Sequence, residues 1–290
     1  VILNQPITVK LSAEVESNVI PFRSQIALNS QVTLDIENNH YRLNPLSMTT
    51  HFQSQNLPAA LPAITLNTQV DVDLNQQSLK VSPLTLQVLE TTLSGEMQVH
   101  NLLNNLSISG KLQLAEFNPQ RLIQQFKLPT LRSDKLLKKV ALETHFETDL
   151  AQLSLVNLRL QLDDNRVNLP KLQVNLPQQT LVGEAISIQA LGMTLNGQLQ
   201  VQQLLTQPIV SGKLAVAPVS PPQVFAKLAD WNLKPAIVWP PYLKTVALQT
   251  QFEARAQELQ LVNFNLQVAD NQLTMPKLVI NLVQQTLKTE

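Results

Sequence analysis

TLSGEMQVHNLL, at residues 92–103, returns as TLNGQLQVQQLL at residues 194–205, an offset of 102 residues. The same offset carries SGKL, at residues 109–112, onto an identical tetrapeptide. Further along, QQTL at residues 178–181 returns at an offset of 106, so the second copy has gained four residues in between. Many identities in one order, with one small insertion, indicate an internal duplication, which is the signature of a repeat-built architecture.

Alternation of apolar and polar residues predicts what each repeat is made of. LRLQLD at residues 158–163 and VALETHF at residues 140–146 have the two-residue period of strands that bury one face and expose the other. Within LSLVNL, at residues 153–158, the alternation changes parity. We expect a β-bulge near Val156 and Asn157, because an extra residue there returns both halves of the strand to one face.

A weaker echo extends the pattern toward the N-terminus. IALNSQV at residues 26–32 resembles ITLNTQV at residues 64–70. The chain is therefore predicted to consist of hairpins added in series. We expect one continuous repeat-built β region without a domain break, with approximate units at residues 1–91, 92–193 and 194–290.

Two short helices are predicted at equivalent places in the repeat. The first spans residues 117–126, with Asn118 at the N-cap and Pro119 at the first helical position. Its copy spans residues 219–228, with Ser220 as the cap. The predicted fold is therefore mainly β: an elongated, curved antiparallel β-sheet groove, repeat-built and bridge-like, with two short α-helices.

The composition excludes several classes of function. Lys and Arg total 21 and Asp and Glu total 21, so no basic field exists to attract nucleic acid. Cysteine is absent, which removes disulfides, thiol nucleophiles and Cys-ligated metals. Only six glycines and 4% aromatic residues argue against phosphate-cradling loops and stacking surfaces. The chain begins with Val1 rather than Met, and we expect it to be a piece of a longer protein.

No catalytic or metal-ligating set of side chains emerges from the sequence. Asp163 and Asp164 are adjacent, so on a strand they would point to opposite faces, and they are better explained as a turn. The four histidines have no metal-ligand spacing. Gly110 and Lys111 are followed by Leu112, where a phosphate-binding loop needs Ser or Thr. We therefore expect no enzyme activity, no metal and no cofactor.

One stretch resembles a known family. SGKLQLAEFNPQRL at residues 109–122, the strand at residues 140–146, and LRLQLDDN at residues 158–165 are similar to the core repeat of AsmA-like proteins of the Gram-negative envelope. The resemblance is best from about Leu93 to Leu181 and recurs in degraded form to the C-terminus. One departure is Gln120, which separates the proline from the arginine of the family pattern.

This resemblance implies a periplasmic protein, tethered to the inner membrane by an N-terminal helix that is absent from this chain. It also implies a long groove lined with apolar residues, and a link to phospholipid traffic and outer-membrane assembly.

The one-sided strands and the resemblance together predict a noncatalytic lipid-binding or lipid-transfer protein of the bacterial periplasm. Its apolar groove would carry phospholipid between the inner and outer membranes, with phospholipid acyl chains and the inner membrane as partners. The alternative is a structural or assembly scaffold with a self-filled β core that recruits outer-membrane proteins, because alternation does not distinguish a packed core from a lined cavity. The residues expected to line the groove are Leu142, Phe146, Leu158, Leu160, Leu162, Leu248, Phe252, Phe264, Leu266 and Val268.

Overall fold

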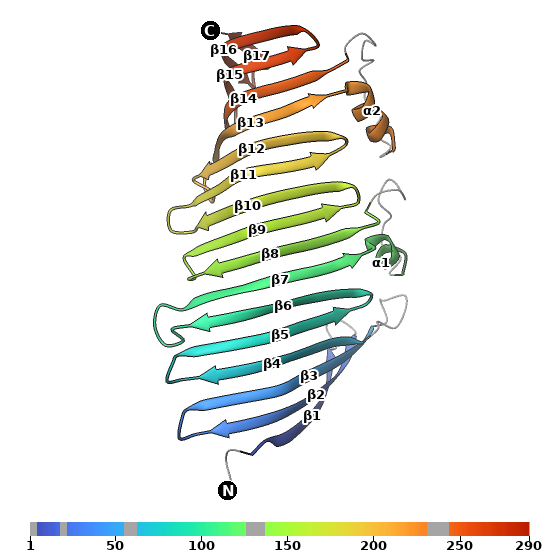
Figure 1. Cartoon of the computed structure of the whole chain (residues 1–290), viewed down its shortest axis with the longest axis vertical. Helices are drawn as coiled ribbons and strands as arrows, with labels where there is room; N and C mark the ends of the chain where they lie inside the picture. The colour runs from blue at the N-terminus through green and yellow to red at the C-terminus, as the bar shows by residue number, and fades with distance from the viewer. Residues whose placement is uncertain (1–4, 18–21, 55–62, 126–136, 231–243, 290) are drawn as a thin grey trace. The chain divides into compact units, whose positions relative to one another are not determined.

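A computed structural model describes residues 5–17, 22–54, 63–125, 137–230 and 244–289. Within these ranges the chain forms seventeen β-strands and two short helices (Figure 1). The strands are antiparallel and form an open, curved β-sheet. The predicted fold class, mainly β with two short helices, is therefore confirmed.

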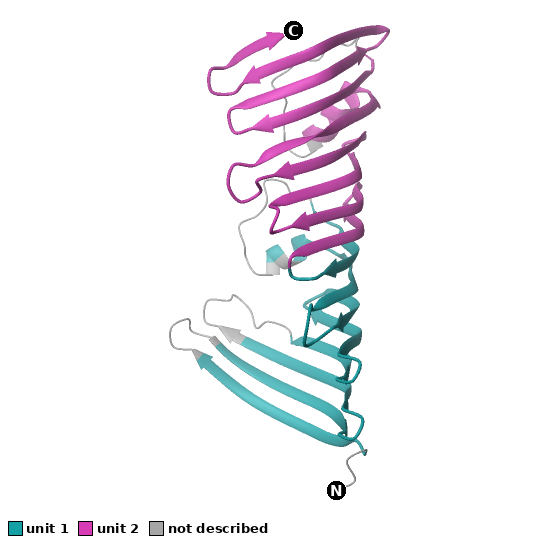
Figure 2. Cartoon of the chain, turned by 90° about the vertical axis from the view of Figure 1, so that its left-hand side faces the viewer, with its two compact units in different colours: residues 1–131, 137–150 teal, residues 132–136, 151–290 magenta. Residues whose placement is uncertain are grey.

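The chain divides into two compact units (Figure 2). Unit 1 comprises residues 1–131 and 137–150, and unit 2 comprises residues 132–136 and 151–290. The three approximate units predicted from the sequence, residues 1–91, 92–193 and 194–290, follow the period of the duplication. Their boundaries differ from those of the two compact units. Unit 1 contains β1 (Ile7–Ser17), β2 (Phe22–Asp35), β3 (His40–Ser54), β4 (Ile64–Asp73), β5 (Ser78–Val88), β6 (Thr91–His100), β7 (Ser107–Phe117), α1 (Pro119–Gln125) and β8 (Val140–Thr148). Unit 2 contains β9 (Gln152–Leu162), β10 (Asn165–Asn175), β11 (Thr180–Ala190), β12 (Met193–Gln202), β13 (Ile209–Val219), α2 (Pro221–Asp230), β14 (Val246–Arg255), β15 (Glu258–Val268), β16 (Asn271–Asn281) and β17 (Thr286–Thr289).

Each unit is a meander, in which every strand pairs antiparallel with the next strand of that unit. Antiparallel neighbours need only a short connection, so short turns join most of these strands. The longer β7–β8 and β13–β14 connections contain α1 and α2. Asp163 and Asp164 form the two-residue turn between β9 and β10, with Asp163 at φ 55°. The prediction that these two aspartates form a turn is confirmed.

The β-bulge expected in β9 is not present in its pairing with β10. Asn157 has φ 54°, but the register is the same on both sides of it, from Leu158–Leu169 to Val156–Lys171, so neither strand has an extra residue there. Its copy in β15, Asn263, has the same φ of 54°. There the pairing of β15 with β14 does shift, from Asn265–Gln249 to Val262–Gln251, so β15 has one extra residue relative to β14.

Buried hydroxyl groups lie where the register shifts. Ser30 of β2, Thr68 of β4 and Thr250 of β14 are all buried, and each adjoins a shift in the pairing with the next strand. The Thr250 hydroxyl lies 2.9 Å from the carbonyl oxygen of Gln251 and 3.2 Å from that of Val262, so its one proton is shared between these two acceptors. A small residue fits beside the bulge, and in Thr250 its hydroxyl satisfies carbonyl groups that the interrupted ladder leaves available.

A glycine faces a phenylalanine ring at equivalent places in both copies. Gly110 pairs with Phe146, and Gly212 pairs with Phe252. A Cβ added to Gly212 would collide with the carbonyl oxygen of Gln198 and lie 3.1 Å from the Phe252 ring. The ring covers backbone that no side chain can cover, a device known from other sheets as aromatic rescue of glycine.

Both helices begin as predicted. The Asn118 side chain accepts a hydrogen bond from the N–H of Gln120 at 3.0 Å, which caps α1. Helix α2 starts at Pro221, directly after Ser220, and buries Pro221 and Val224. Residue 126, the last of the predicted first helix, lies outside the described residues.

We predict that Gly212→Ala lowers the free energy of unfolding by about 1–3 kcal/mol, because the added methyl group forces backbone apart. Thermal and urea unfolding followed by circular dichroism would measure the loss. Gly183→Ala is the matched control: Gly183 also lies inside a strand, but its Cβ would meet only the ends of flexible side chains, those of Ile186 at 3.3 Å and Leu172 at 3.5 Å. Equal losses in the two variants would contradict the assigned role of Gly212.

Candidate functional site

The apolar side chains of unit 2 align into a row that crosses eight consecutive strands. Every step of this row is a directly paired position in the register of neighbouring strands. Because paired residues point to the same side, the row forms one continuous apolar stripe. The apolar row of unit 2 consists of Leu160, Val167, Ile188, Leu195, Val216, Leu248, Leu266 and Leu273.

Unit 1 repeats the arrangement on its own sheet. Its row also crosses eight strands, from β1 to β8, without a polar interruption. The apolar row of unit 1 consists of Leu11, Leu28, Met48, Leu66, Leu86, Leu93, Leu114 and Leu142.

The structure places the predicted lining residues on these apolar faces. In unit 2, Leu160, Leu248 and Leu266 belong to the row itself. In unit 1, Leu142 ends the row and Phe146 lies on the same face, over Gly110. The remaining five lie on the same face of unit 2 in neighbouring positions: Leu158, Leu162, Phe252, Phe264 and Val268.

Sequence reasoning missed most members of both rows. Ile188, Leu195 and Val216 are examples from β11, β12 and β13. The strands that contain these residues alternate as clearly as the strands of the predicted lining residues. Aligning the two copies of the duplication over their full length would have identified them. For instance, Leu195 lies 102 residues after Leu93, and both are row members.

Within the described residues, neither apolar face is covered by a second layer that would make it an ordinary core. All ten predicted lining residues are half-buried. Among the residues that the structure describes, the buried apolar side chains are Val99, Val201, Val224 and Leu278, and no large side chain is fully buried. A two-sheet sandwich of this length would bury many more. The apolar faces therefore remain partly accessible.

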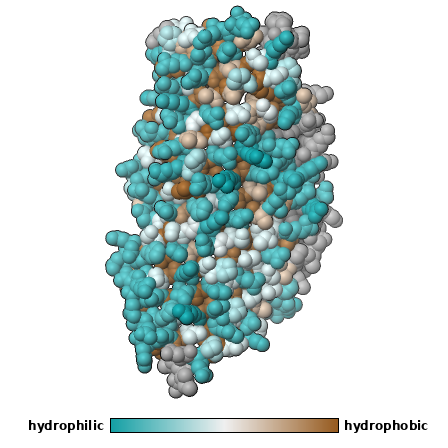
Figure 3. Space-filling view, viewed as in Figure 1, coloured by the Kyte–Doolittle hydropathy of each residue, from teal (hydrophilic) through white to brown (hydrophobic). Residues whose placement is uncertain are grey.

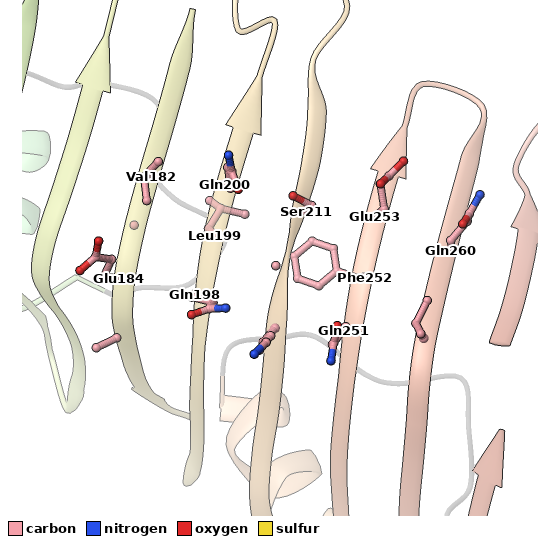
Figure 4. A pocket seen from close by; sticks show the side chains of 15 residues that line it. Val182, Glu184, Gln198, Leu199, Gln200, Ser211, Gln251, Phe252, Glu253 and Gln260 are labelled. Carbon is pink, nitrogen blue, oxygen red and sulfur yellow. The ribbon is translucent and has the colours of Figure 1, made fainter. Parts of the chain in front are cut away.

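The opposite face of the sheet is polar. Hydrophilic residues predominate over the surface seen in Figure 3. In unit 2 a hollow of about 740 Å³ spans β11 to β15 (Figure 4). Its lining includes the amides of Gln198, Gln200 and Gln251 and the carboxylates of Glu184 and Glu253, together with the apolar side chains of Leu199 and Phe252. Amides and carboxylates offer hydrogen bonds there. In the described ranges no group of three His, Asp or Glu side chains is placed to hold a metal ion.

A charged cluster lies on β3 and β4. Asp71 accepts a hydrogen bond from His40 Nε2 at 2.7 Å and another from Arg42 Nε at 2.8 Å. Partial burial raises the pKa of the Asp71 carboxyl, but these two donors outweigh it, so the pKa lies below its ordinary value. The cluster ties two strands together and faces away from the apolar row, because Asp71 and Val72 lie on opposite sides of β4.

Comparisons with known proteins add no identity: no protein-family model, curated protein or solved structure matches the chain. In the part of the chain that the structure describes, no helix combines the length and the apolar character needed to cross a bilayer.

We predict that Asp71→Asn lowers stability at pH 7 by about 1 kcal/mol or less, because the carboxylate is partly exposed. A carboxyl whose pKa is lowered by folding stabilises the protein above its unfolded pKa, and this contribution is lost as the pH falls through the folded value. The difference between variant and wild type should therefore shrink toward pH 3 in thermal unfolding experiments. Asp164→Asn serves as a control in the exposed β9–β10 turn. A difference that persists unchanged at acid pH would refute the linkage.

Proposed function

We propose that this chain is a noncatalytic lipid-binding protein whose apolar faces hold the acyl chains of phospholipids. The observation that carries the proposal is the uninterrupted apolar row across eight strands of unit 2, half-buried from Leu160 to Leu266 and exposed at Leu273, with no closed core among the described residues. An apolar face of this kind either packs against protein or holds an apolar ligand.

The dimensions of the row suit an acyl chain. Seven steps between neighbouring strands, each about 4.8 Å, give roughly 34 Å. One leaflet of a bilayer has an apolar thickness of about 15 Å, half of the hydrocarbon core. The row of one unit is therefore longer than an extended acyl chain. Each CH₂ removed from water contributes about 0.8 kcal/mol, so a lipid can be held without a specific polar site.

The uniformity of the row supports movement as well as binding. Leu195, Val216 and Leu248 offer equivalent aliphatic surface at successive steps, and no charged side chain interrupts the row. A bound chain therefore finds similar free energy at each position along the row. This uniformity is what a conduit needs, whereas a storage pocket would have one deep site.

The resemblance to AsmA-like proteins extends the proposal to the cell. On that basis the protein lies in the bacterial periplasm, is anchored to the inner membrane in its full-length form, and carries phospholipid between the inner and outer membranes, contributing to outer-membrane assembly. The lack of any catalytic motif in the sequence agrees with a role without chemistry.

The test introduces charge into the row. Leu195→Asp combined with Leu266→Asp should reduce phospholipid retained by the purified protein by about tenfold or more, because a buried carboxylate opposes apolar contact. Native mass spectrometry and lipid extraction after incubation with phospholipid vesicles would measure retention. The matched control is Asn196→Asp combined with Gln267→Asp, which places the same charges one residue away on the polar face.

Circular dichroism must show that the doubly substituted protein is folded. If it unfolds, the face is an ordinary core. If the wild-type protein takes up no phospholipid from vesicles, the scaffold with a self-filled core becomes the better explanation. Retention that is equal in the row variant and the control would also count against lipid binding on this face.

A further inference from the structure

Exposed aliphatic side chains lie at the tips of hairpin turns at one end of the strands of unit 2. The turns are β10–β11, β12–β13 and β16–β17, at the strand ends opposite α2. Their most exposed residues are Leu176 at 51%, Leu205 at 71%, Leu282 at 55% and Val283 at 68% of full exposure. These residues belong neither to the apolar row nor to the polar hollow. We call them the leucine margin.

The leucine margin is held rigidly by turn hydrogen bonds. Asn175 Oδ1 accepts the N–H of Gln178 at 2.8 Å, and Asn281 Oδ1 accepts that of Gln284 at 2.7 Å. Gln179 and Gln285, which end these two turns, both have φ 52°. The two turns thus share one fixed conformation that projects the aliphatic residue after the asparagine.

Neighbouring turns are also tied to one another. The N–H of Leu204 donates to the carbonyl of Gln179 at 3.0 Å, and the N–H of Leu282 donates to that of Gln257 at 2.8 Å. Exposed leucines on such a braced backbone are displayed at fixed positions, and they gain nothing in the isolated chain from being apolar.

The turns of the leucine margin carry no net charge. Residues 175–179, 203–207 and 281–285 contain no ionisable side chain, and asparagine and glutamine amides flank the leucines. In the remaining turn at this end, between β14 and β15, Arg255 and Glu258 have opposite charges. The margin therefore neither attracts nor repels a charged surface strongly.

The spacing of the exposed leucines indicates which kind of binding partner fits them. The β10–β11 and β12–β13 turns lie two strands apart, which is about 9.6 Å, and the β16–β17 turn lies four strands further on. The exposed leucines therefore form separate points rather than a contiguous patch. A folded protein partner needs a continuous, complementary apolar centre. A fluid bilayer accepts each side chain separately, with amides left among the headgroups. We propose that the leucine margin of unit 2 docks onto the surface of a lipid bilayer, inserting Leu176, Leu205, Leu282 and Val283.

Two of the corresponding turns of unit 1 provide an internal contrast. Leu74 occupies the same place in the β4–β5 turn and is 42% exposed, but it follows Asp73. The β2–β3 turn carries Asp35 and Glu37. Carboxylates at these positions oppose transfer into a low-dielectric interface. The β6–β7 turn is different: residues 101–105 have no ionisable side chain, and Leu103, the copy of Leu205, is 74% exposed, so this one turn of unit 1 has the character of the leucine margin.

The experiment is flotation of the whole chain with uncharged phosphatidylcholine vesicles. Leu176→Gln, Leu205→Gln and Leu282→Gln combined should weaken vesicle association about tenfold or more, because the inserted apolar area is lost. The three residues are exposed, so the unfolding temperature should stay within about 1–2 °C of wild type. Leu74→Gln is the matched control, with the same turn position and chemistry but an acidic neighbour, and should float like the wild type.

Several outcomes would overturn the proposal: a wild-type protein that does not float, a triple variant that floats equally well, or a Leu74→Gln variant that is as impaired as the triple variant. Self-association seen by analytical ultracentrifugation, and abolished in the triple variant, would instead assign the margin to a second copy of the chain. The row variant Leu195→Asp/Leu266→Asp should still float, and the triple variant should still retain lipid, so failure of docking and failure of lipid binding are distinguishable.

Discussion

The antiparallel hydrogen-bond register between successive strands aligns the apolar side chains into rows, because side chains alternate between the two faces with a period of two residues. A slip of one residue between β12 and β13 would send Leu214 and Val216 to the polar face while Leu195 stayed behind. Asn157 and Asn263 adopt left-handed conformations where the sequence changes parity, and beside Asn263 the register between β14 and β15 shifts by one residue. The whole apolar face thus depends on where extra residues are inserted into the ladder.

Local signals predicted the elements well. Alternation identified the strands, the parity change in residues 153–158 located the left-handed residue Asn157, and Asn118 with Pro119 marked the start of α1. These features are decided by neighbouring residues, so one stretch of sequence contains the information. Row membership is different, because it depends on the register of each pair of strands, and shifts such as the one at Ser30 leave no local signature. The exposure of Leu176 and Leu205 was equally invisible, since an apolar residue in a turn gives no indication of what covers it.

The two copies of the duplication agree on one face and differ on the other. Leu142, Thr144 and Phe146 correspond to Leu248, Thr250 and Phe252, which keep the apolar row, the buried hydroxyl and the ring over glycine. On the polar face, Lys111 forms an ion pair with Glu143 at 2.9 Å, whereas the second copy has Lys213 with Gln249 at those positions. Exposed ion pairs contribute little to stability, so their replacement is inexpensive. The apolar row and the register shifts tolerate far less change, since they determine which side chains lie together on the apolar face.

Pairing only between consecutive strands within each unit also decides how the protein comes apart. Contacts between near neighbours in sequence favour rapid formation of individual hairpins, because little loop-closure entropy opposes them. Stability in such a chain is approximately a sum of nearest-neighbour couplings, as in other linear repeat proteins. Strands at the edge of a sheet then fray while the interior of the meander persists. Denaturation is consequently a graded loss of hairpins from an edge, so a free energy of unfolding measured for one substitution describes the hairpins around that residue.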